Sequence, residues 1–216
     1  MKRKFNNWTN HFFNFLAVIL GVYLAFYINE RAKLNQDRKE SRLLMNSLIN
    51  DLSDDIKTYE EYQIPKNIQY QENLERLLNL LLSDNLDSLD SQLSSILGVE
   101  NYAPTTSTYS SMKSSGKLSL FDDLALQKKL SDYYEGQVPE SVRKGEFQVE
   151  YFTNELLTWL TNNVDLMDME ILKKDELVVL KNKLIIYSSL IDQKVKSYEV
   201  IVLDSKKLKL HIESIL

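Results

Sequence analysis

The chain has 216 residues, 44% apolar content and a formal net charge of −5. This length supports one compact domain plus a membrane anchor, and it is too short for two independent cores. Only five glycines and three prolines interrupt the chain, a composition typical of an all-α protein. Because the sequence has no cysteine, it excludes disulfides, thiolate metal sites and thiol nucleophiles.

The N-terminus has the pattern of a transmembrane helix. A short basic leader, residues 1–11, precedes an almost uninterrupted apolar run, residues 12–28. As a helix this run rises roughly 26 Å, close to the ~30 Å hydrocarbon core of a bilayer. No small-x-small cleavage site follows it, so we expect an uncleaved signal anchor. The leader's cations are Lys2, Arg3 and Lys4, and the interfacial aromatics are Trp8 and Tyr27.

Basic residues lie on both sides of the span, so the positive-inside count alone is ambiguous. We favour a cytoplasmic N-terminus in the inner membrane, because long domains downstream of a signal anchor translocate largely regardless of charge. The prediction continues with a charged juxtamembrane helix over residues 29–42 and a periplasmic helical bundle over residues 43–216. The juxtamembrane cations suit lipid headgroups or an acidic partner.

Within the span, Ala17, Gly21 and Ala25 recur every four residues and share one helix face, which lets a second backbone approach closely. Asn14 lies on or near the same face, where an amide is better satisfied by a neighbouring helix than by lipid. The face predicts packing against other membrane subunits or a second copy. The alternative is that small residues are common in any span and Asn14 lies near the interface.

Beyond the span, an apolar stripe predicts that the anchor helix continues without a break until Pro65. Two shorter helices are expected over residues 67–82 and 88–97, the second closed by Gly98. The acidic segment between them lacks the ligand spacing of an EF-hand, and we predict no metal site and no cofactor. The stripe consists of Met45, Leu48, Leu52, Ile56 and Tyr59, and the acidic segment contains Asp84, Asp87 and Asp90.

The stretch SSGKLSLFDD contains a glycine followed by lysine, as in a phosphate-binding loop. A P-loop also needs an upstream glycine and a hydroxyl residue after the lysine, whereas Lys117 is followed by Leu118. We therefore interpret the stretch as a stop between helices, with Gly116 left-handed after a helix over residues 106–115. Leu118 then returns to the core, and Asp122 caps the next helix.

That next helix is expected to end at Gly136, and another to begin at Pro139. The alternation of Phe147, Val149 and Tyr151 could instead form a strand. We favour the helix because no matching strand is evident elsewhere. The isolated apolar run at residues 200–203 could supply such a strand, so the alternative stays open.

The C-terminal segment has the most regular spacing in the chain and predicts one helix of roughly 40 residues, about 60 Å long. Its seam either packs inside an antiparallel bundle or is shared between subunits of a homo-oligomer. The seam consists of Leu177, Leu180, Leu184, Tyr187, Ile191, Lys194, Tyr198, Ile201, Ser205, Leu208, Ile212 and Ile215.

Two motifs stand out in the chain. The first is the anchor with Gly21 and Ala25 followed by Ile28-Asn29, and the second is the turn over residues 115–118 followed by a Leu-rich helix and a tyrosine pair, Tyr133-Tyr134. Together they resemble a family of uncharacterised single-pass envelope membrane proteins common in Bacteroidota. Many members carry Glu where this chain has Asn14. The resemblance implies a cell-envelope location and a helical extramembrane domain, and it implies no established reaction.

The sequence offers little that could support catalysis or nucleic-acid binding. Neither His11 nor His211 has a partner at metal-ligand spacing, and the acidic pairs at 54–55, 60–61 and 122–123 place adjacent carboxylates on different sides of a helix. Beyond the leader lie 23 basic and 31 acidic residues, a formal charge of −8 that repels phosphate. We therefore expect a non-enzymatic protein.

Two functions remain open. The first is an accessory or scaffolding subunit of an inner-membrane complex for energy transduction, transport or secretion. The second is a periplasmic bundle that senses a small ligand and signals through a partner, because this chain has neither a second span nor a cytoplasmic signalling domain.

Overall fold

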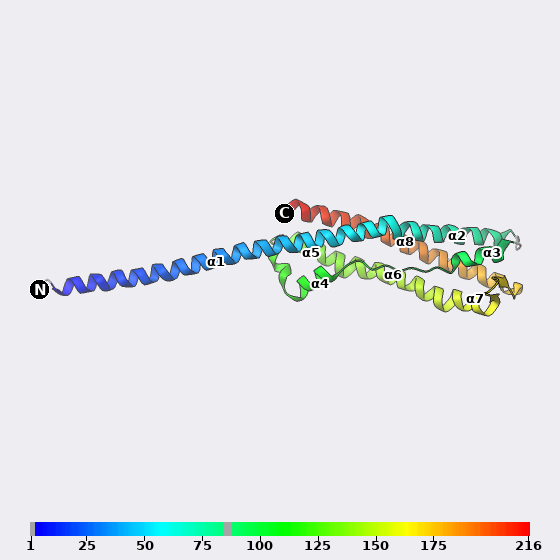
Figure 1. Cartoon of the computed structure of the whole chain (residues 1–216), viewed down its shortest axis with the longest axis horizontal. Helices are drawn as coiled ribbons and strands as arrows, with labels where there is room; N and C mark the ends of the chain where they lie inside the picture. The colour runs from blue at the N-terminus through cyan, green and yellow to red at the C-terminus, as the bar shows by residue number, and fades with distance from the viewer. Residues whose placement is uncertain (1–2, 84–87) are drawn as a thin grey trace.

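The computed structural model describes residues 3–83 and 88–216 and is an all-α rod with one much longer helix at its N-terminal end (Figure 1). Asp84 and Asp87 of the acidic segment lie outside the described residues. The predicted architecture is confirmed: the N-terminal helix runs on into an antiparallel helical bundle, and the C-terminus lies beside the middle of that helix.

The N-terminal helix extends further than the sequence suggested. Helix α1 (Arg3–Thr58) continues through a π-helical turn, Tyr59–Gln63, into α2 (Ile64–Leu82). The predicted end at Pro65 is therefore wrong, and the expected separate helix 67–82 is the far part of the same rod. Pro65 directly follows the wide π turn, where its missing N–H and its ring are accommodated without a break.

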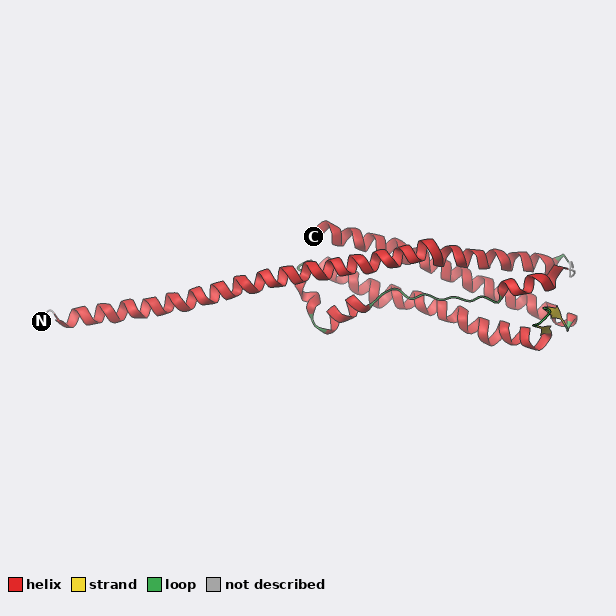
Figure 2. Ribbon diagram, viewed as in Figure 1, coloured by secondary structure: helices red, strands yellow, loops and turns green. Residues whose placement is uncertain are grey.

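A short helical segment and an extended segment follow at the far end of the rod. Helix α3 (Leu89–Leu93) ends in a 3-10 turn, Ser94–Ile96. Residues 97–106, here called the crossover segment, have no regular structure and run back along the bundle to α4 (Ser107–Ser114), as Figure 2 shows. Gly98 does not adopt the left-handed conformation. An added Cβ there would clash with the ring of Tyr70, so its role is close packing.

The middle of the chain forms one more long helical arm. After a 3-10 turn, Lys117–Leu120, come α5 (Leu124–Ser131), a π turn (Asp132–Gln137), α6 (Val138–Tyr151), a π turn (Phe152–Leu156) and α7 (Leu157–Asn163). The predicted stop at Gly136 is wrong, because Gly136 lies inside a π turn and Pro139 again follows that wider turn. Residues 147–151 are helical, as predicted.

The chain reverses in a small hairpin and returns as α8. Strands β1 (Val164–Asp165) and β2 (Glu170–Ile171) pair antiparallel, with Val164 opposite Ile171. This two-residue ladder was not predicted, and it is too short to give an alternating pattern. After a 3-10 turn, Lys174–Glu176, helix α8 (Leu177–Ile215) runs 39 residues back toward α1, which matches the predicted C-terminal helix.

Two apolar clusters fill the bundle, one at each end. The cluster nearer the N-terminal helix joins α1, α4, α5 and α8 around Leu52, Met112 and Ile201. The far cluster joins α2, α3, α7 and α8 around Leu77, Leu160 and Leu184. Between them lies a row of buried polar side chains from the long helices, Gln63, Asn67, Gln148 and Lys194.

Candidate functional site

The apolar segment, residues 12–28 of α1, stands apart from the bundle (Figure 1). Its side chains are exposed throughout, and none of its most apolar window is buried by the described chain. Within that described part, α1 with its continuation to Leu82 is the one helix long and apolar enough to cross a membrane.

No described part of the chain covers the predicted packing face of this segment. Asn14, Ala17, Gly21 and Ala25 are all exposed, and a Cβ added at Gly21 would meet nothing within 4 Å. No contact inside the described chain therefore requires a glycine at position 21. A partner helix on this face stays a prediction.

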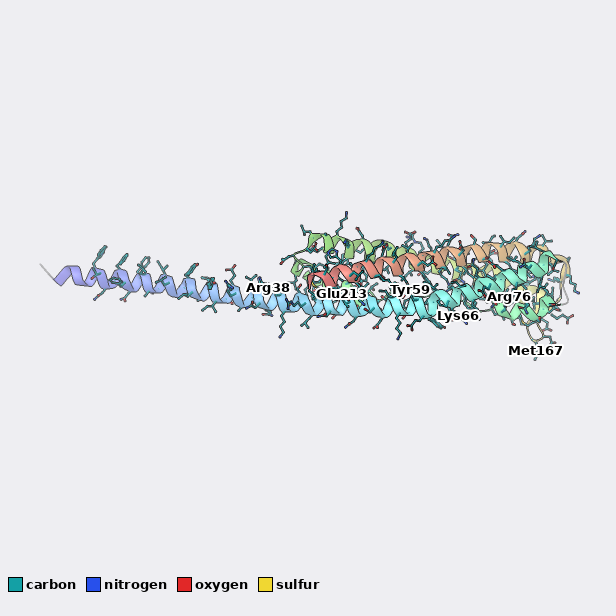
Figure 3. The ribbon with its side chains drawn as sticks, turned by 90° about the horizontal axis from the view of Figure 1, so that it is seen from above. Arg38, Tyr59, Lys66, Arg76, Met167 and Glu213 are labelled. Carbon is teal, nitrogen blue, oxygen red and sulfur yellow. The ribbon has the colours of Figure 1, made fainter. Side chains whose placement is uncertain are left out.

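The charged stretch 29–42 links the apolar segment to the bundle without leaving α1. The guanidinium carbon of Arg31 lies 5.4 Å from the ring centroid of Tyr27, a cation–π contact at the end of the apolar segment. The bundle begins at Ser41, which is buried. Here a groove of about 710 Å³ opens between α1, the turn after α4 and the end of α8; Figure 3 labels Arg38 at this place. The groove carries charges of both signs, among them Arg38, Arg42 and Asp122.

The predicted turn at Gly116 closes this end of the bundle. Gly116 has a φ of 70°, the left-handed conformation that favours glycine after a helix. Its neighbour Lys117 places Nζ 2.7 Å from Glu40 Oε1, and Leu118 packs on the near apolar cluster. The lysine of the glycine–lysine pair therefore binds a carboxylate of α1.

The predicted cap, Asp122, is corrected to the next residue. Asp123 Oδ1 accepts hydrogen bonds from the backbone N–H groups of Ala125 and Leu126, at 2.8 and 3.1 Å, whereas Asp122 is exposed. Sequence spacing alone could not choose between two adjacent aspartates. Asp123 Oδ2 also lies 2.8 Å from Nε2 of His211, and the hydrogen bond with His211 is the main reason that the pKa of Asp123 is lowered. Sequence reasoning missed this histidine–aspartate pair because 88 positions separate its members.

A buried carboxylate holds one end of the crossover segment. Asp55 of α1 accepts hydrogen bonds from the Tyr102 hydroxyl at 2.7 Å, the Thr105 N–H at 2.8 Å and the Thr105 hydroxyl at 3.1 Å. Burial raises the pKa of Asp55, while these three hydrogen bonds act to lower it. The carboxylate thus supplies acceptors to backbone and side-chain groups that have no helix or sheet partner of their own.

A buried lysine holds the other end. Lys194 of α8 has 0% exposure; its Nζ donates to the Glu100 carbonyl at 2.7 Å and to Gln148 Oε1. Burial lowers the pKa of Lys194 to about 8. One turn further along α8, the Tyr198 hydroxyl lies 3.2 Å from Asn101 Oδ1, so α8 contacts consecutive residues of the crossover segment.

The close approach of this segment also explains a glycine in α6. A Cβ at Gly145 would clash with the Asn101 side chain, so a larger residue at this position would have to displace that side chain. Aromatic rings complete the enclosure: the Tyr59 centroid lies 5.0 Å from that of Tyr102 and 4.7 Å from that of Tyr198. Asp55, Lys194, Gln148 and Gly145 together form a polar centre that fixes the crossover segment between the two apolar clusters.

The sequence does not predict the polar centre. Helical spacing alone places Lys194 in the α8 seam, and Asp55 is interpreted as the surface residue of an acidic pair. Asp54 is exposed and Asp55 is buried, so the two do point to different sides of α1, as predicted. An available signal was a lysine at a seam position that requires an apolar residue, because such a residue needs a buried acceptor.

The α8 seam packs inside the chain. Leu180, Leu184, Tyr187, Ile191, Tyr198, Ile201, Leu208 and Ile212 are buried, Leu177 is half-buried and Ile215 is exposed. The contacts of α8 with α1, α2 and α6 account for this burial. Of the two interpretations left open, an intramolecular bundle seam is the one that the fold uses.

The described residues, 3–83 and 88–216, bring together no group of three or more His, Asp or Glu side chains that could hold a metal ion. Comparisons with protein-family models, with curated proteins and with solved structures find no match to this chain.

Proposed function

We propose that this chain is a non-enzymatic, membrane-anchored accessory or scaffolding subunit of an inner-membrane complex for energy transduction, transport or secretion. Residues 12–28 span the inner membrane with the N-terminus in the cytoplasm, and the bundle stands in the periplasm. The small-residue face of the span packs against helices of the other subunits, and lipid covers the rest.

One observation carries this proposal: an apolar segment that the bundle does not cover is continuous with the helix that packs into the bundle. The described residues bury no part of the most apolar window of that segment, so its amide at Asn14 and its small-residue face at Gly21 are available to other helices. A flexible link would serve a tethered enzyme, whereas a continuous helix fixes the bundle's position relative to whatever the span contacts.

The hydrogen bonds made by the ionisable side chains of the bundle support the same proposal. The buried ionisable groups, Asp55 and Lys194, make hydrogen bonds to the crossover segment, and His211 is joined to the helix cap at Asp123. These groups hold the fold together, which is the requirement for a rigid interaction module.

The test is affinity purification of the full-length protein in a mild detergent, with identification of co-purifying membrane proteins and the mass of the intact particle. Gly21→Ile is expected to release stoichiometric partners, because a branched side chain separates the two backbones. Ile19→Phe adds bulk on the opposite face of the span and is the matched control. Recovery of the same partners by wild type and Gly21→Ile, or purification of a lone chain, would contradict the proposal.

A further inference from the structure

Three side chains tie the C-terminal end of α8 to α5. Lys129 Nζ lies 2.7 Å from His211 Nδ1, and His211 Nε2 lies 2.8 Å from Asp123 Oδ2. Asp123 in turn accepts the backbone N–H groups at the start of α5. His211 is therefore the middle link between a cation and an anion, and each of its ring nitrogens contacts a charged group.

These contacts fix one form of the imidazole. A lysine ammonium has donors and no acceptor, so the ring nitrogen that faces Lys129 must accept a hydrogen bond. The nitrogen that faces the Asp123 carboxylate must donate one. His211 is therefore neutral in this arrangement, with its proton on Nε2. A second proton on Nδ1 would place two donors and two positive charges 2.7 Å apart.

Protonation of His211 would break the link to Lys129 and keep the link to Asp123. The Asp123 carboxylate is held by two backbone N–H groups of α5, and a positive imidazole strengthens its hydrogen bond with that carboxylate. Lys129 is exposed, so its long side chain can turn toward solvent. The lysine is the member of the three that leaves.

A second position for the Lys129 ammonium lies one turn along the chain. Asp132 is exposed and follows Lys129 by three residues, a spacing at which side chains on a helix meet. Both residues line a cavity of about 240 Å³ between α5 and α8, which Asp204 and Lys207 line from the α8 side. Asp204 is already paired with Lys207 at 2.9 Å, so Asp132 is the carboxylate available to Lys129.

The other charged groups at this end of the bundle come from α8, α1 and the turn before α5. Lys207 lies one turn before His211 and is paired as described above, and Lys117 is paired with Glu40 of α1. The groove that Asp123 lines also contains Asp37, Arg38, Lys39, Arg42 and Asp122. These five carry three positive and two negative charges, so they do not favour holding a further cation beside a protonated His211.

We propose that His211 is a proton-sensitive switch between α5 and α8. The neutral ring holds Lys129 and Asp123 together, whereas the protonated ring keeps Asp123 and releases Lys129 toward Asp132. Histidine suits this role because its side chain ordinarily changes charge between pH 5 and pH 8. At mildly acidic pH, α8 is then joined to α5 by one of these two links, and the rim of the groove beside Asp123 gains a positive charge. The switch goes beyond the proposed function and does not depend on it.

Nitrogen NMR of the histidine ring tests the starting form. The chain has two histidines, so His11→Gln in the full-length protein in detergent micelles leaves His211 as the single imidazole. With nitrogen-labelled histidine at pH 8, we expect the proton on Nε2 and none on Nδ1, and at pH 5 a proton on both. A proton on Nδ1 at pH 8, or a ring that stays neutral at pH 5, would overturn the inference.

The same NMR titration tests the role of Lys129. Lys129→Met removes both the donor to the neutral ring and the cation that opposes protonation, so the midpoint of the His211 titration should move upward by about 0.5 pH units or more. Lys128→Met, at the exposed lysine next to it, is the matched control and should move the midpoint by less than about 0.2 pH units. An unchanged or lower midpoint in Lys129→Met would contradict the switch.

Asp132→Asn tests where the released ammonium goes. If Asp132 receives Lys129, loss of its charge disfavours the protonated form, and the midpoint should move downward. In the Lys129→Met background the same change should have no effect, because there is no ammonium to receive. Equal movement in both backgrounds, or no movement in either, would overturn the proposed destination. These measurements involve no partner, so they can fail or succeed independently of the Gly21→Ile test.

Discussion

Two parts of one continuous helix differ only in their side chains. Residues 12–28 are apolar around the whole circumference and contact no other helix of the bundle, whereas residues 45–82 carry an apolar stripe on one side and pack against α8. The backbone is helical in both. The backbone hydrogen bonds of the helix therefore form in both parts, and the distribution of apolar residues decides whether the bundle packs against it.

The largest effect is expected from the same truncation made in both parts. Leu52→Ala removes a fully buried side chain from the near cluster and is expected to lower the free energy of unfolding by about 2–5 kcal/mol. Leu20→Ala in the exposed apolar segment is expected to change it by less than about 0.5 kcal/mol. Urea titrations of the full-length protein in detergent micelles measure both. Equal losses would contradict the separation between anchor and bundle.

The next effect concerns the polar centre and depends on pH. The pKa of Lys194 is about 8 in the folded chain, below its ordinary value of 10.5, so the unfolded chain binds more protons between these values. The free energy of unfolding should therefore rise from pH 8 to pH 9, by about 1 kcal/mol. The buried tyrosines, whose pKa values are raised, ionise first in the unfolded chain, so they oppose this rise as the pH approaches 10.

Lys194→Met should abolish this rise, because the methionine does not titrate. Lys144→Met, at a partly exposed site on α6, is the control and should keep the rise. Denaturant midpoints at pH 8, 8.5 and 9 give the comparison. A rise of the same size in Lys194→Met would assign the pH dependence to another group.

The smallest effect distinguishes two adjacent aspartates. Asp123→Ala removes the cap of α5 and is expected to cost about 1 kcal/mol. Asp122→Ala removes an exposed carboxylate from the groove and should be within about 0.5 kcal/mol of wild type. Thermal unfolding of the two single variants under identical conditions decides between them, and a larger loss for Asp122→Ala would reverse the assignment of the cap.

The sequence predicts the long elements because their apolar spacing is sustained over many turns. The α8 helix, with its seam from Leu180 to Ile212, and the passage from the apolar segment into α1 are both of this kind. Local breakers were less reliable. Pro65, Gly136 and Pro139 indicate helix ends on their own, but each lies in or just after a π turn that lets the helix continue.

The polar centre could not be predicted because its contacts join distant parts of the chain. Lys194 and Glu100 are 94 positions apart, and Asp55 and Thr105 are 50 apart. Residues 97–106 have no periodicity, so nothing in them indicates that they pass through the bundle beside α6 and α8. The one local indication is Gly145, a glycine in a helix interior, where the missing side chain leaves room for Asn101.

The helix runs without interruption from the apolar segment to Leu82, so a rotation at one end displaces the other end. From Ile28 to Leu82 the helix rises about 80 Å, and no hinge of glycine or loop interrupts it. If residues 12–28 span a bilayer, as proposed, a ~10° tilt of that span moves the far end of the rod, where Met167 lies (Figure 3), sideways by about 14 Å. A change of bilayer thickness or a movement of a neighbouring helix would thus be converted into a displacement several times larger at the tip.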